Sequence, residues 1–465
     1  GKLINAFLDR LDADPALHDK VEFAVVPTIL TPNFENEFVA RYRGVLSVAE
    51  KAEYTIRLSD LTRAAFTGDS LTHALFLIEK LRNIQENTLL KERAEAETLR
   101  QFDVVQRLAE AIGQCRSSGT LPFAVIARHA FIAEAWLRSA AHAGVLAPER
   151  LEMLKRSIET VSGRLTRDFD AVLAGSMSGE DFLQVYGHLR PGAYDIMSPS
   201  YRERPDLFSA DMRRHSALAD VPFFAFSPAE KAGMEELSAS CGMTFSAASF
   251  LHYVRRAIAG REYAKFIFTR HLDHILHLVK VWGRHFAFSP DDLSMLSVDD
   301  IVSHGFTPLP TAGREHFLER VESGRREYTT GRYFKLAYLI RSPRDVYIVP
   351  QHRSQPNFIG RSAVEAGVAV LTPDEEIPDM EGRLVCIESA DPGYDWIFTR
   401  NIAGLITRYG GANSHMAIRC AEYGLPAAIG CGDKIFEEAV ACRRLRMDCA
   451  AGTIRPAEHL PGEQH

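Results

Sequence analysis

Apolar residues recur at spacings of three and four over about the first 330 positions, as one buried face of an α-helix requires. Ser227 and Pro228 are typical of a helix start. We expect a break near Gly260 to divide the last helical stretch into two pieces. The β-branched run 20–30 is the exception and predicts a strand. The helical pattern covers 70–115, 121–146, 147–175, 226–243 and 245–284.

The pattern changes after about residue 332, where short β-branched and aromatic runs alternate with glycine, proline and aspartate. Residues 352–367 are expected to form a linker. The predicted fold is multidomain, α followed by α/β, with a mostly helical domain over 1–345 and a compact α/β domain over 346–465. The runs expected to be strands are 333–340, 345–350, 367–371, 383–389, 396–399, 403–407 and 427–431.

Composition and charge exclude some classes of partner. The 465 residues are 46% hydrophobic and 25% charged, as in ordinary globular proteins, and the formal net charge of −7 argues against nucleic acid. No apolar run reaches the roughly 20 residues of a membrane helix, and the first residues do not have a signal-peptide layout. The seven cysteines are scattered without a CxxC pair, which is typical of reduced thiols. We therefore expect a cytoplasmic protein with no nucleic-acid or membrane partner.

The segment TRYGGANSHMAIRCAEYGLPAAIG, residues 407–430, combines a glycine pair, one histidine and a short helical run. After a strand, Gly410 and Gly411 are expected to form a turn. Asn413 or Ser414 is then expected to cap the next helix by accepting from its free N–H groups.

The helix is expected to span 415–423, with Gly424 as its stop. His415 then lies at the helix N-terminus, where free N–H groups and a positive partial charge favour an anion. An imidazole there stays more neutral, and a phosphoryl group added to it is stabilised. The glycines allow another molecule to approach closely. From the residues alone, a capped surface histidine on an ordinary turn is an equally open reading.

The same segment resembles the phosphohistidine motif of the phosphoenolpyruvate synthase and pyruvate phosphate dikinase superfamily. The matching positions are Gly404, Thr407, Gly410, Gly411, Ser414, His415, Ala417, Ile418, Glu422, Gly424, Pro426 and Gly430. The resemblance implies a swivelling phosphohistidine domain with His415 as its catalytic residue. It implies phosphate contacts from Gly410, Gly411, Asn413 and Ser414.

Two positions depart from the family pattern. Asn413 stands where many members have threonine, and Ala421 stands where the family has a helix arginine. Arg419 lies one helical turn after His415 and on the same face, so we expect it to take over a phosphate-facing role.

The order of segments is similar to one branch of the superfamily. A histidine domain at the C-terminus, after a helical domain and with no phosphoenolpyruvate barrel behind it, resembles rifampin phosphotransferase. It resembles still more the dikinase-like enzymes of capsule gene clusters, which include L-glutamine kinase. Residues 19–28, 186–205 and 261–276 carry this likeness.

The helical domain offers candidate residues for binding an acceptor. Arg190 suits a carboxylate or phosphate, and His188 or Asp195 can orient or deprotonate an acceptor group. The alternatives are a loop whose aspartate and arginine pair with each other, and a solvated basic helix face. The candidates are Tyr186, His188, Arg190, Tyr194, Asp195, Arg128, Arg261 and Lys265.

The spacing of His271, His274 and His277 does not favour a metal site. The third lies about 240° around the helix from the first, and the sequence around them has no cysteine or acidic ligand pattern. We therefore predict no metal.

The resemblance implies a phosphotransferase that uses ATP and Mg²⁺ in its complete form. Residues 1–330 show no ATP-grasp pattern, so we expect that domain to be absent from this chain and supplied by another domain or subunit. The chain alone is then expected to bind no cofactor. In the implied reaction His415 is pyrophosphorylated by ATP, water removes the outer phosphate, and the remaining phosphoryl group passes to the acceptor.

The expected acceptor is a small polar molecule, and the resemblance favours the amide of L-glutamine in a capsule phosphoramidate pathway. An antibiotic phosphotransferase similar to the rifampin enzyme is the alternative with the same chemistry, and it requires a large apolar pocket. A noncatalytic phosphocarrier or scaffold is the alternative from another class. It predicts a histidine domain without an acceptor pocket.

Overall fold

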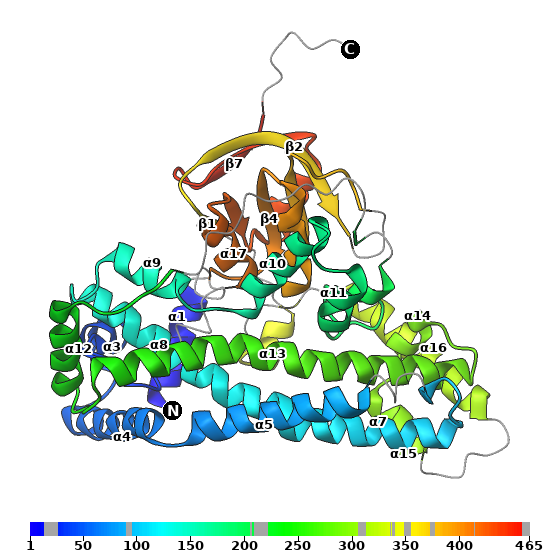
Figure 1. Cartoon of the computed structure of the whole chain (residues 1–465), viewed down its shortest axis with the longest axis horizontal. Coiled ribbons are helices and arrows are strands. Elements are labelled where there is room, and N and C mark those ends of the chain that lie inside the picture. The colour runs from blue at the N-terminus through cyan, green and yellow to red at the C-terminus, as the bar shows by residue number, and fades with distance from the viewer. Residues whose placement is uncertain are drawn as a thin grey trace, which may run out of the picture.

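A helical part and an α/β part build the molecule, and the α/β part lies on top of the long helix α13 (Ala247–Arg284) in Figure 1. This architecture confirms the predicted fold class, α followed by α/β. Within the described ranges, no helix combines the length and apolarity needed to cross a membrane. The computed structural model describes residues 1–13, 27–89, 95–204, 207–208, 222–305, 313–334, 336, 340–347, 355–372, 377–412 and 414–457.

Each stretch with helical periodicity contains helix, and Ser227 caps α12 with Pro228 in its first turn, as predicted. Most of run 20–30, expected to be a strand, lies outside the described residues, and the part described, 27–30, is not a strand. The helices are α1 (Lys2–Ala13), α3 (Phe34–Tyr42), α4 (Val48–Thr67), α5 (Ser70–Ile84), α7 (Gln101–Cys115), α8 (Leu121–His142), α9 (Pro148–Arg156), α10 (Val161–Leu173), α11 (Gly179–Tyr186), α12 (Pro228–Ser240), α13, α14 (Pro290–Ser294), α15 (Val298–Gly305) and α16 (Gly313–Gly331). Shorter π and 3-10 turns are η2 (Gln85–Leu89), η3 (Arg116–Thr120), η4 (Tyr201–Glu203) and η5 (Pro343–Val346).

Helix α13 is one unbroken helix of 38 residues, so the break expected near Gly260 is wrong. Gly260 faces α5 and α8, because a Cβ there would lie 2.9 Å from Leu75 Cδ2 and 3.5 Å from Ile126 Cγ2. The glycine therefore allows a close approach of neighbouring helices. The packing outweighs the roughly 1 kcal/mol by which glycine disfavours a helix interior.

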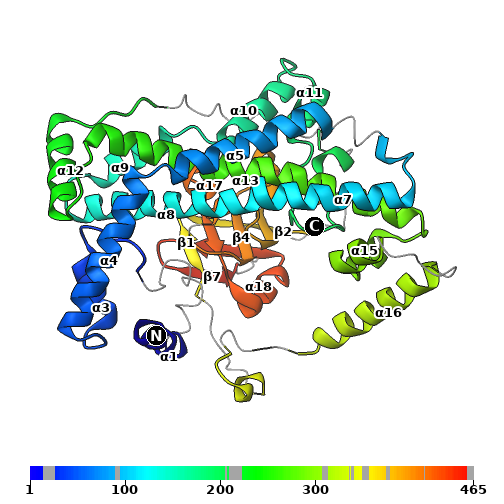
Figure 2. The same cartoon turned by 90° about the horizontal axis from the view of Figure 1, so that it is seen from below.

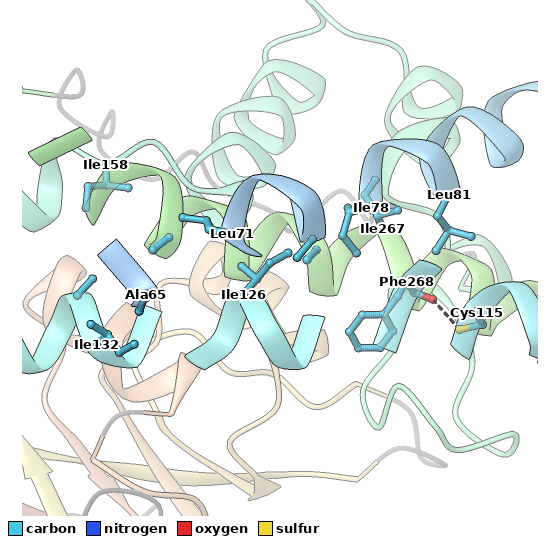
Figure 3. Close-up of a cluster of buried hydrophobic side chains, with 14 of the residues drawn as sticks. Ala65, Leu71, Ile78, Leu81, Cys115, Ile126, Ile132, Ile158, Ile267 and Phe268 are labelled. Carbon is cyan, nitrogen blue, oxygen red and sulfur yellow. Dashed lines mark hydrogen bonds between the residues drawn. The ribbon is translucent and has the colours of Figure 1, made fainter. Parts of the chain in front are cut away.

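The core of the helical part lies between α13 and the helices α5, α7 and α8 that run beside it (Figure 2). Burial of each large apolar side chain contributes about 1.5–3 kcal/mol, so this core holds α13 in place under the α/β part. Figure 3 shows part of this core, including Leu71, Ile78, Leu81, Ile126, Ile132, Ile267 and Phe268.

Over its described residues, the α/β part is a seven-stranded mixed sheet with the order β1-β5-β4-β3-β2-β6-β7. Strands β2 to β5 are parallel neighbours, whereas β1, β6 and β7 pair antiparallel at the two sides. The elements are β1 (Asn357–Ile359), β2 (Ala363–Leu371), β3 (Leu384–Ser389), η6 (Pro392–Arg400), β4 (Gly404–Tyr409), α17 (His415–Tyr423), β5 (Ala427–Ile429), α18 (Gly432–Val440), β6 (Arg444–Asp448) and β7 (Thr453–Pro456).

Some strand predictions are confirmed and others are wrong. The runs 367–371, 383–389, 403–407 and 427–431 contain strand residues, whereas the expected linker 352–367 contains β1 and the start of β2. The described residues of 345–350 lie at the 3-10 turn η5, and those of 333–340 are not a strand.

Run 396–399, expected to be a strand, lies in the 3-10 helix η6. Trp396, Ile397 and Phe398 are all buried, and an uninterrupted apolar run does not distinguish a buried strand from a buried helix. Asp391 begins the helix, since its side chain accepts the N–H of Gly393 at 2.8 Å.

An apolar cluster joins the two parts. Leu165 of α10 and Tyr201 of η4 share it with Ile397 and Met416 of the α/β part. The O–H of Tyr201 also donates to the carbonyl of Gly393 at 3.1 Å. The α/β part is therefore docked with η6 and α17 against the segment of α10, α11 and η4.

Candidate functional site

Two neighbouring parallel strands end beside the helical part. Strand β3 leads into η6, which carries Asp395, and β4 leads into the glycine turn before α17, which begins at His415. Parallel neighbours have their carboxyl ends at the same edge of a sheet, which is where α/β folds place ligands. The topology thus brings two side chains together that lie 20 residues apart.

The helix that begins at His415 has the bounds and caps predicted from the sequence. Its N-cap Ser414 accepts the N–H of Ala417 at 3.3 Å. Gly424 ends the helix with a φ of 63°, a left-handed conformation that favours glycine.

Close packing requires a glycine in the turn before α17. Gly410 has a φ of 139°, and a Cβ there would lie 2.6 Å from the Cβ of Ala390. The carbonyl of Gly411 accepts the N–H of Ser414 at 2.9 Å, which closes the turn before the helix. Asn413, a predicted phosphate contact, lies outside the described residues.

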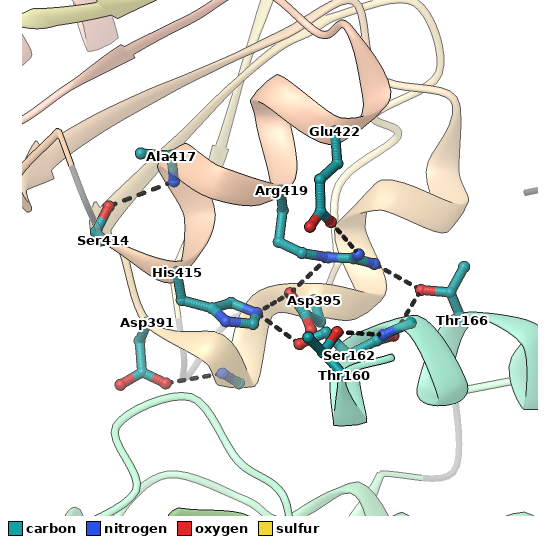
Figure 4. Close-up of polar contacts among 12 residues, drawn as sticks. Thr160, Ser162, Thr166, Asp391, Asp395, Ser414, His415, Ala417, Arg419 and Glu422 are labelled. Carbon is teal, nitrogen blue, oxygen red and sulfur yellow. Dashed lines mark hydrogen bonds and ion pairs between the residues drawn. The ribbon is translucent and has the colours of Figure 1, made fainter. Parts of the chain in front are cut away.

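A buried carboxylate holds the imidazole of His415 (Figure 4). Its Nε2 lies 2.7 Å from Oδ1 of Asp395 and 3.4 Å from Oγ of Ser162, which belongs to α10. Asp395 is 5% exposed, so the pair is shielded from water. The histidine therefore has a ring position set by its own domain and a contact to the other part of the molecule.

The two groups favour each other's charged form. Burial works against the charge of His415, but the Asp395 carboxylate outweighs it and raises the pKa of His415. Burial also opposes ionisation of Asp395, yet His415 and Arg419 lower the pKa of that carboxyl. The expectation that the helix end keeps the imidazole more neutral is wrong, because a carboxylate at hydrogen-bond distance outweighs the partial charge of a helix end.

Arg419 lies buried beside this pair, with its Nε 3.8 Å from Oδ1 of Asp395. Its other nitrogens donate to Glu422 at 2.7 Å, to Thr166 of α10 at 2.6 Å and to the hydroxyl of Tyr423 at 2.6 Å. Arg419 therefore supports the negative charge of Asp395 and ties α17 to the helical part.

A cavity lies between the two parts at this position. Its empty space, counted out to its open mouth, is about 670 Å³. The α/β part lines it with Asp391, Pro392, Gly393, Asp395 and His415. The helical part lines it with Val161, Ser162, Leu165, His188, Leu189, Arg190, Ala193, Glu262, Lys265, Phe266 and Thr269.

Three of the predicted acceptor residues line this cavity: His188, Arg190 and Lys265. Burial holds the pKa of His188 well below its usual range, so its ring is neutral at pH 7, with Nε2 3.2 Å from the carbonyl oxygen of Phe266. Burial also lowers the pKa of Lys265.

An ion pair holds the loop that carries Arg190, but the partner of Arg190 is not Asp195, the aspartate of the same loop. The guanidinium of Arg190 forms an ion pair with Asp273 of α13 and donates to the carbonyl of Ser198 at 3.1 Å. Asp195 is exposed and accepts the N–H of Met197 at 2.9 Å, and it is not among the residues lining the cavity.

The remaining candidates also lie away from the cavity lining. Tyr186 is buried, and its O–H donates to Asp168 at 2.7 Å. The guanidinium of Arg261 stacks over an aromatic ring of α8, 5.1 Å from the ring centroid. Tyr194 is 67% exposed, and Arg128 is exposed on α8.

Sequence reasoning missed Asp395, Ser162 and Glu262. Asp395 was overlooked because its surroundings were taken for a strand, and nothing in the sequence places it beside His415. Glu262 could have been found, since it lies three residues before Lys265 and hence on the same face of a helix.

The histidines of α13 do not gather metal ligands. The rings of His271 and His274 pack edge to face with centroids 6.2 Å apart, and burial lowers the pKa of His271 to about 4. In the part of the chain that the structure describes, no group of three His, Cys, Asp or Glu residues is placed to hold a metal ion.

Comparison with known proteins agrees with the geometry of the α/β part. No curated protein matches the chain. Residues 379–452, which include η6, the glycine turn and α17, match the family described as PEP-utilising enzyme, mobile domain. The stretch that carries His415 and Asp395 is therefore similar to the mobile, phosphohistidine-carrying domain of PEP-utilising enzymes.

Proposed function

We propose that this chain is the acceptor-binding and phosphohistidine portion of an ATP-dependent, dikinase-type phosphotransferase, with His415 as the phosphoryl carrier. One observation carries the proposal: His415 lies in the wall of a cavity whose opposite wall belongs to the helical part. The match of residues 379–452 to the mobile domain of PEP-utilising enzymes supports it.

Asp395 fits the chemistry of a phosphoryl carrier. An ionised carboxylate hydrogen-bonded to Nε2 orients the ring, and it stabilises the positive charge that the ring gains when its other nitrogen attacks a phosphoryl group. ATP and Mg²⁺ are assigned to an ATP-grasp domain or subunit that works with this chain. The products of the complete system are AMP, phosphate and a phosphorylated acceptor.

The proposed acceptor is a small polar molecule, with the amide of L-glutamine in a capsule phosphoramidate pathway as the favoured candidate. The partly buried Glu262 and Lys265 in the cavity wall support a polar acceptor. The negative net charge supports the further proposal that nucleic acid is not a partner, and the scattered cysteines without a CxxC pair support the proposal of a cytoplasmic location.

An antibiotic phosphotransferase is the second candidate, and one observation favours it. Much of the cavity wall is apolar, as a large drug requires: Val161, Leu165, Leu189, Phe266 and Pro392. A noncatalytic phosphocarrier is less well supported, since a carrier alone needs no cavity with buried charged groups beside its histidine.

The test is phosphoryl transfer by the purified chain. Potassium phosphoramidate serves as the phosphoryl donor, and L-glutamine, L-glutamate, small hydroxyl compounds and rifampin serve as acceptors, with products identified by phosphorus NMR. His415→Ala is expected to abolish phosphorylation of the peptide that carries residue 415 and to slow transfer more than about a hundredfold, as expected when the nucleophile is lost.

His285→Ala is the matched control, because His285 is exposed at the end of α13 and is not part of the cavity wall. It is expected to transfer like the wild type. Unchanged transfer by the His415→Ala variant would overturn the proposal.

A further inference from the structure

The side chain of Glu262 is placed toward the proposed acceptor and has an unsatisfied oxygen. It lines the same cavity as His415, on the α13 face that also carries Lys265. Its Oε2 is buried and has no hydrogen-bond partner among the described residues. Buried polar atoms are nearly always paired, so this oxygen is expected to meet a hydrogen-bond donor on a bound molecule.

The charges around Glu262 come from three elements. On α13, Lys265 shares its face. From α17, His415 and Arg419 favour its charge and Glu422 opposes it, and from η6, Asp395 also opposes it. Burial outweighs these contributions and raises the pKa of Glu262, which suits a group that must take up a proton.

We propose that Glu262 is the general base for the acceptor, and that the acceptor attacks through a neutral nitrogen or oxygen that carries a proton, as in a primary amide or a hydroxyl. This inference rests on the proposed role of His415. Glu262 accepts a hydrogen bond from that N–H or O–H group and so also selects the acceptor.

The step balances in atoms and electrons. The acceptor nitrogen or oxygen forms its bond to phosphorus as the bond between phosphorus and the imidazole nitrogen of His415 breaks. The electron pair of the broken bond returns to the ring. The proton of the attacking group passes to the carboxylate of Glu262 and then to solvent when the product leaves.

The charges in the wall also exclude one class of attacking group. Three carboxylates line the cavity, those of Glu262, Asp391 and Asp395, together with the cations Arg190 and Lys265. At Glu262 a carboxylate or phosphate nucleophile would be repelled and has no proton to give up, whereas an amide or hydroxyl is uncharged and carries one. L-Glutamine is therefore expected to accept the phosphoryl group on its side chain and L-glutamate is not.

The experiment separates the two half-reactions. The full chain is phosphorylated with phosphoramidate, excess donor is removed, and loss of phosphohistidine to each acceptor is followed in a single turnover. Glu262→Gln is expected to phosphorylate at His415 like the wild type but to transfer about 10²- to 10⁴-fold more slowly, the range typical of a lost general base. Its transfer rate should also lose the rise with pH that ionisation of Glu262 gives the wild type.

Two further variants test whether the carboxylate of Glu262 itself is needed for transfer. Glu262→Asp, which keeps the carboxylate on a shorter side chain, is expected to recover part of the rate. Glu134→Gln is the matched control, since Glu134 of α8 pairs with Lys155 of α9 and neither residue lines the cavity. It should transfer at the wild-type rate.

Each other outcome overturns a definite claim. If the wild-type phosphoprotein transfers to none of the acceptors, the proposed function fails and this inference fails with it. If Glu262→Gln transfers at the wild-type rate, or transfer to L-glutamate equals transfer to L-glutamine, only the role of Glu262 is wrong. If Glu262→Gln also loses phosphorylation of His415, Glu262 acts on the histidine and the inference is equally wrong.

Discussion

At the scale of the residue, the charges of His415 and Asp395 make the stability of the fold depend on pH. The raised pKa of His415 means that its contribution to stability is complete below the ordinary histidine value near 6.5 and is lost as pH rises through the raised value. The lowered pKa of Asp395 means that its contribution is complete above the ordinary value near 3.8 and is lost as pH falls through the lowered one. The pair therefore stabilises the fold most between these two ordinary values.

Replacement of Asp395 by asparagine keeps the size of the side chain and removes its charge. Asp395→Asn is expected to lower the pKa of His415, because the adjacent opposite charge that raises it is lost. Nitrogen-15 NMR titration of the imidazole measures the pKa of His415 in the variant and in the wild type. Asp379→Asn is the control, because Asp379 pairs with Arg383 on the surface of the same domain. An unchanged His415 titration in Asp395→Asn would contradict the pairing.

At the scale of the element, α17 depends on its cap. The helix has nine residues, a length at which an isolated helix is unstable in water, so its first turn is held by Ser414 and by packing of Met416 and Cys420. The same first turn carries His415. Fraying of the helix start would therefore move the imidazole out of reach of Asp395.

Ser414→Ala removes the oxygen that accepts the N–H of Ala417. The free energy of opening the first turn is expected to fall by about 0.5–2 kcal/mol, as for other N-cap serines. Hydrogen–deuterium exchange of the amides in 415–423 measures the change. Ser414→Asp, which keeps a capping oxygen, should retain the protection, and equal exchange in the alanine variant and the wild type would show that the cap is not needed.

At the scale of the whole molecule, the site exists only while the two parts are docked. One close approach of the two parts is at Gly393 of η6, where an added Cβ would collide with the carbonyl group of Arg190 and with the nitrogen of Pro191. Backbone atoms cannot move aside as a flexible side chain can. Arg204 adds a contact by stacking over Trp396, 5.4 Å from its centroid.

Gly393→Ala should therefore slow phosphoryl transfer to the acceptor without affecting phosphorylation of His415. Phosphorylation of His415 by phosphoramidate is expected to be retained, because the histidine and Asp395 belong to the same domain. Transfer to the acceptor is expected to fall about a hundredfold, as when reacting groups are displaced by about 1 Å. Single-turnover loss of phosphohistidine measures both steps.

Gly367→Ala is the control for this variant, because a Cβ there meets its nearest atoms at an ordinary 3.7 Å. It should leave both steps unchanged. Wild-type transfer by Gly393→Ala would mean that the docked arrangement is not the one in which the phosphoryl group moves.

Local order along the chain was predictable. Helical periodicity located the helices around α13, and the glycine stop and capping serine gave the bounds of α17, because both signals act within a few residues. Gly260 and the run at Trp396 were misread, since a glycine that allows close helix packing looks like a break and a buried 3-10 helix looks like a strand. A packing glycine can be distinguished from a helix break, and a buried 3-10 helix from a strand, only when the residues packed against them are known.

The sequence by itself determined the class of fold and the position of His415 at a helix start behind a glycine turn. Only the tertiary structure decided what surrounds that histidine. Asp395 comes from the 3-10 helix that follows a neighbouring parallel strand, Ser162 lies 253 residues away on α10, and Glu262 is on α13. Such contacts depend on strand order and on the docking of the two parts, which periodicity within a single element does not encode.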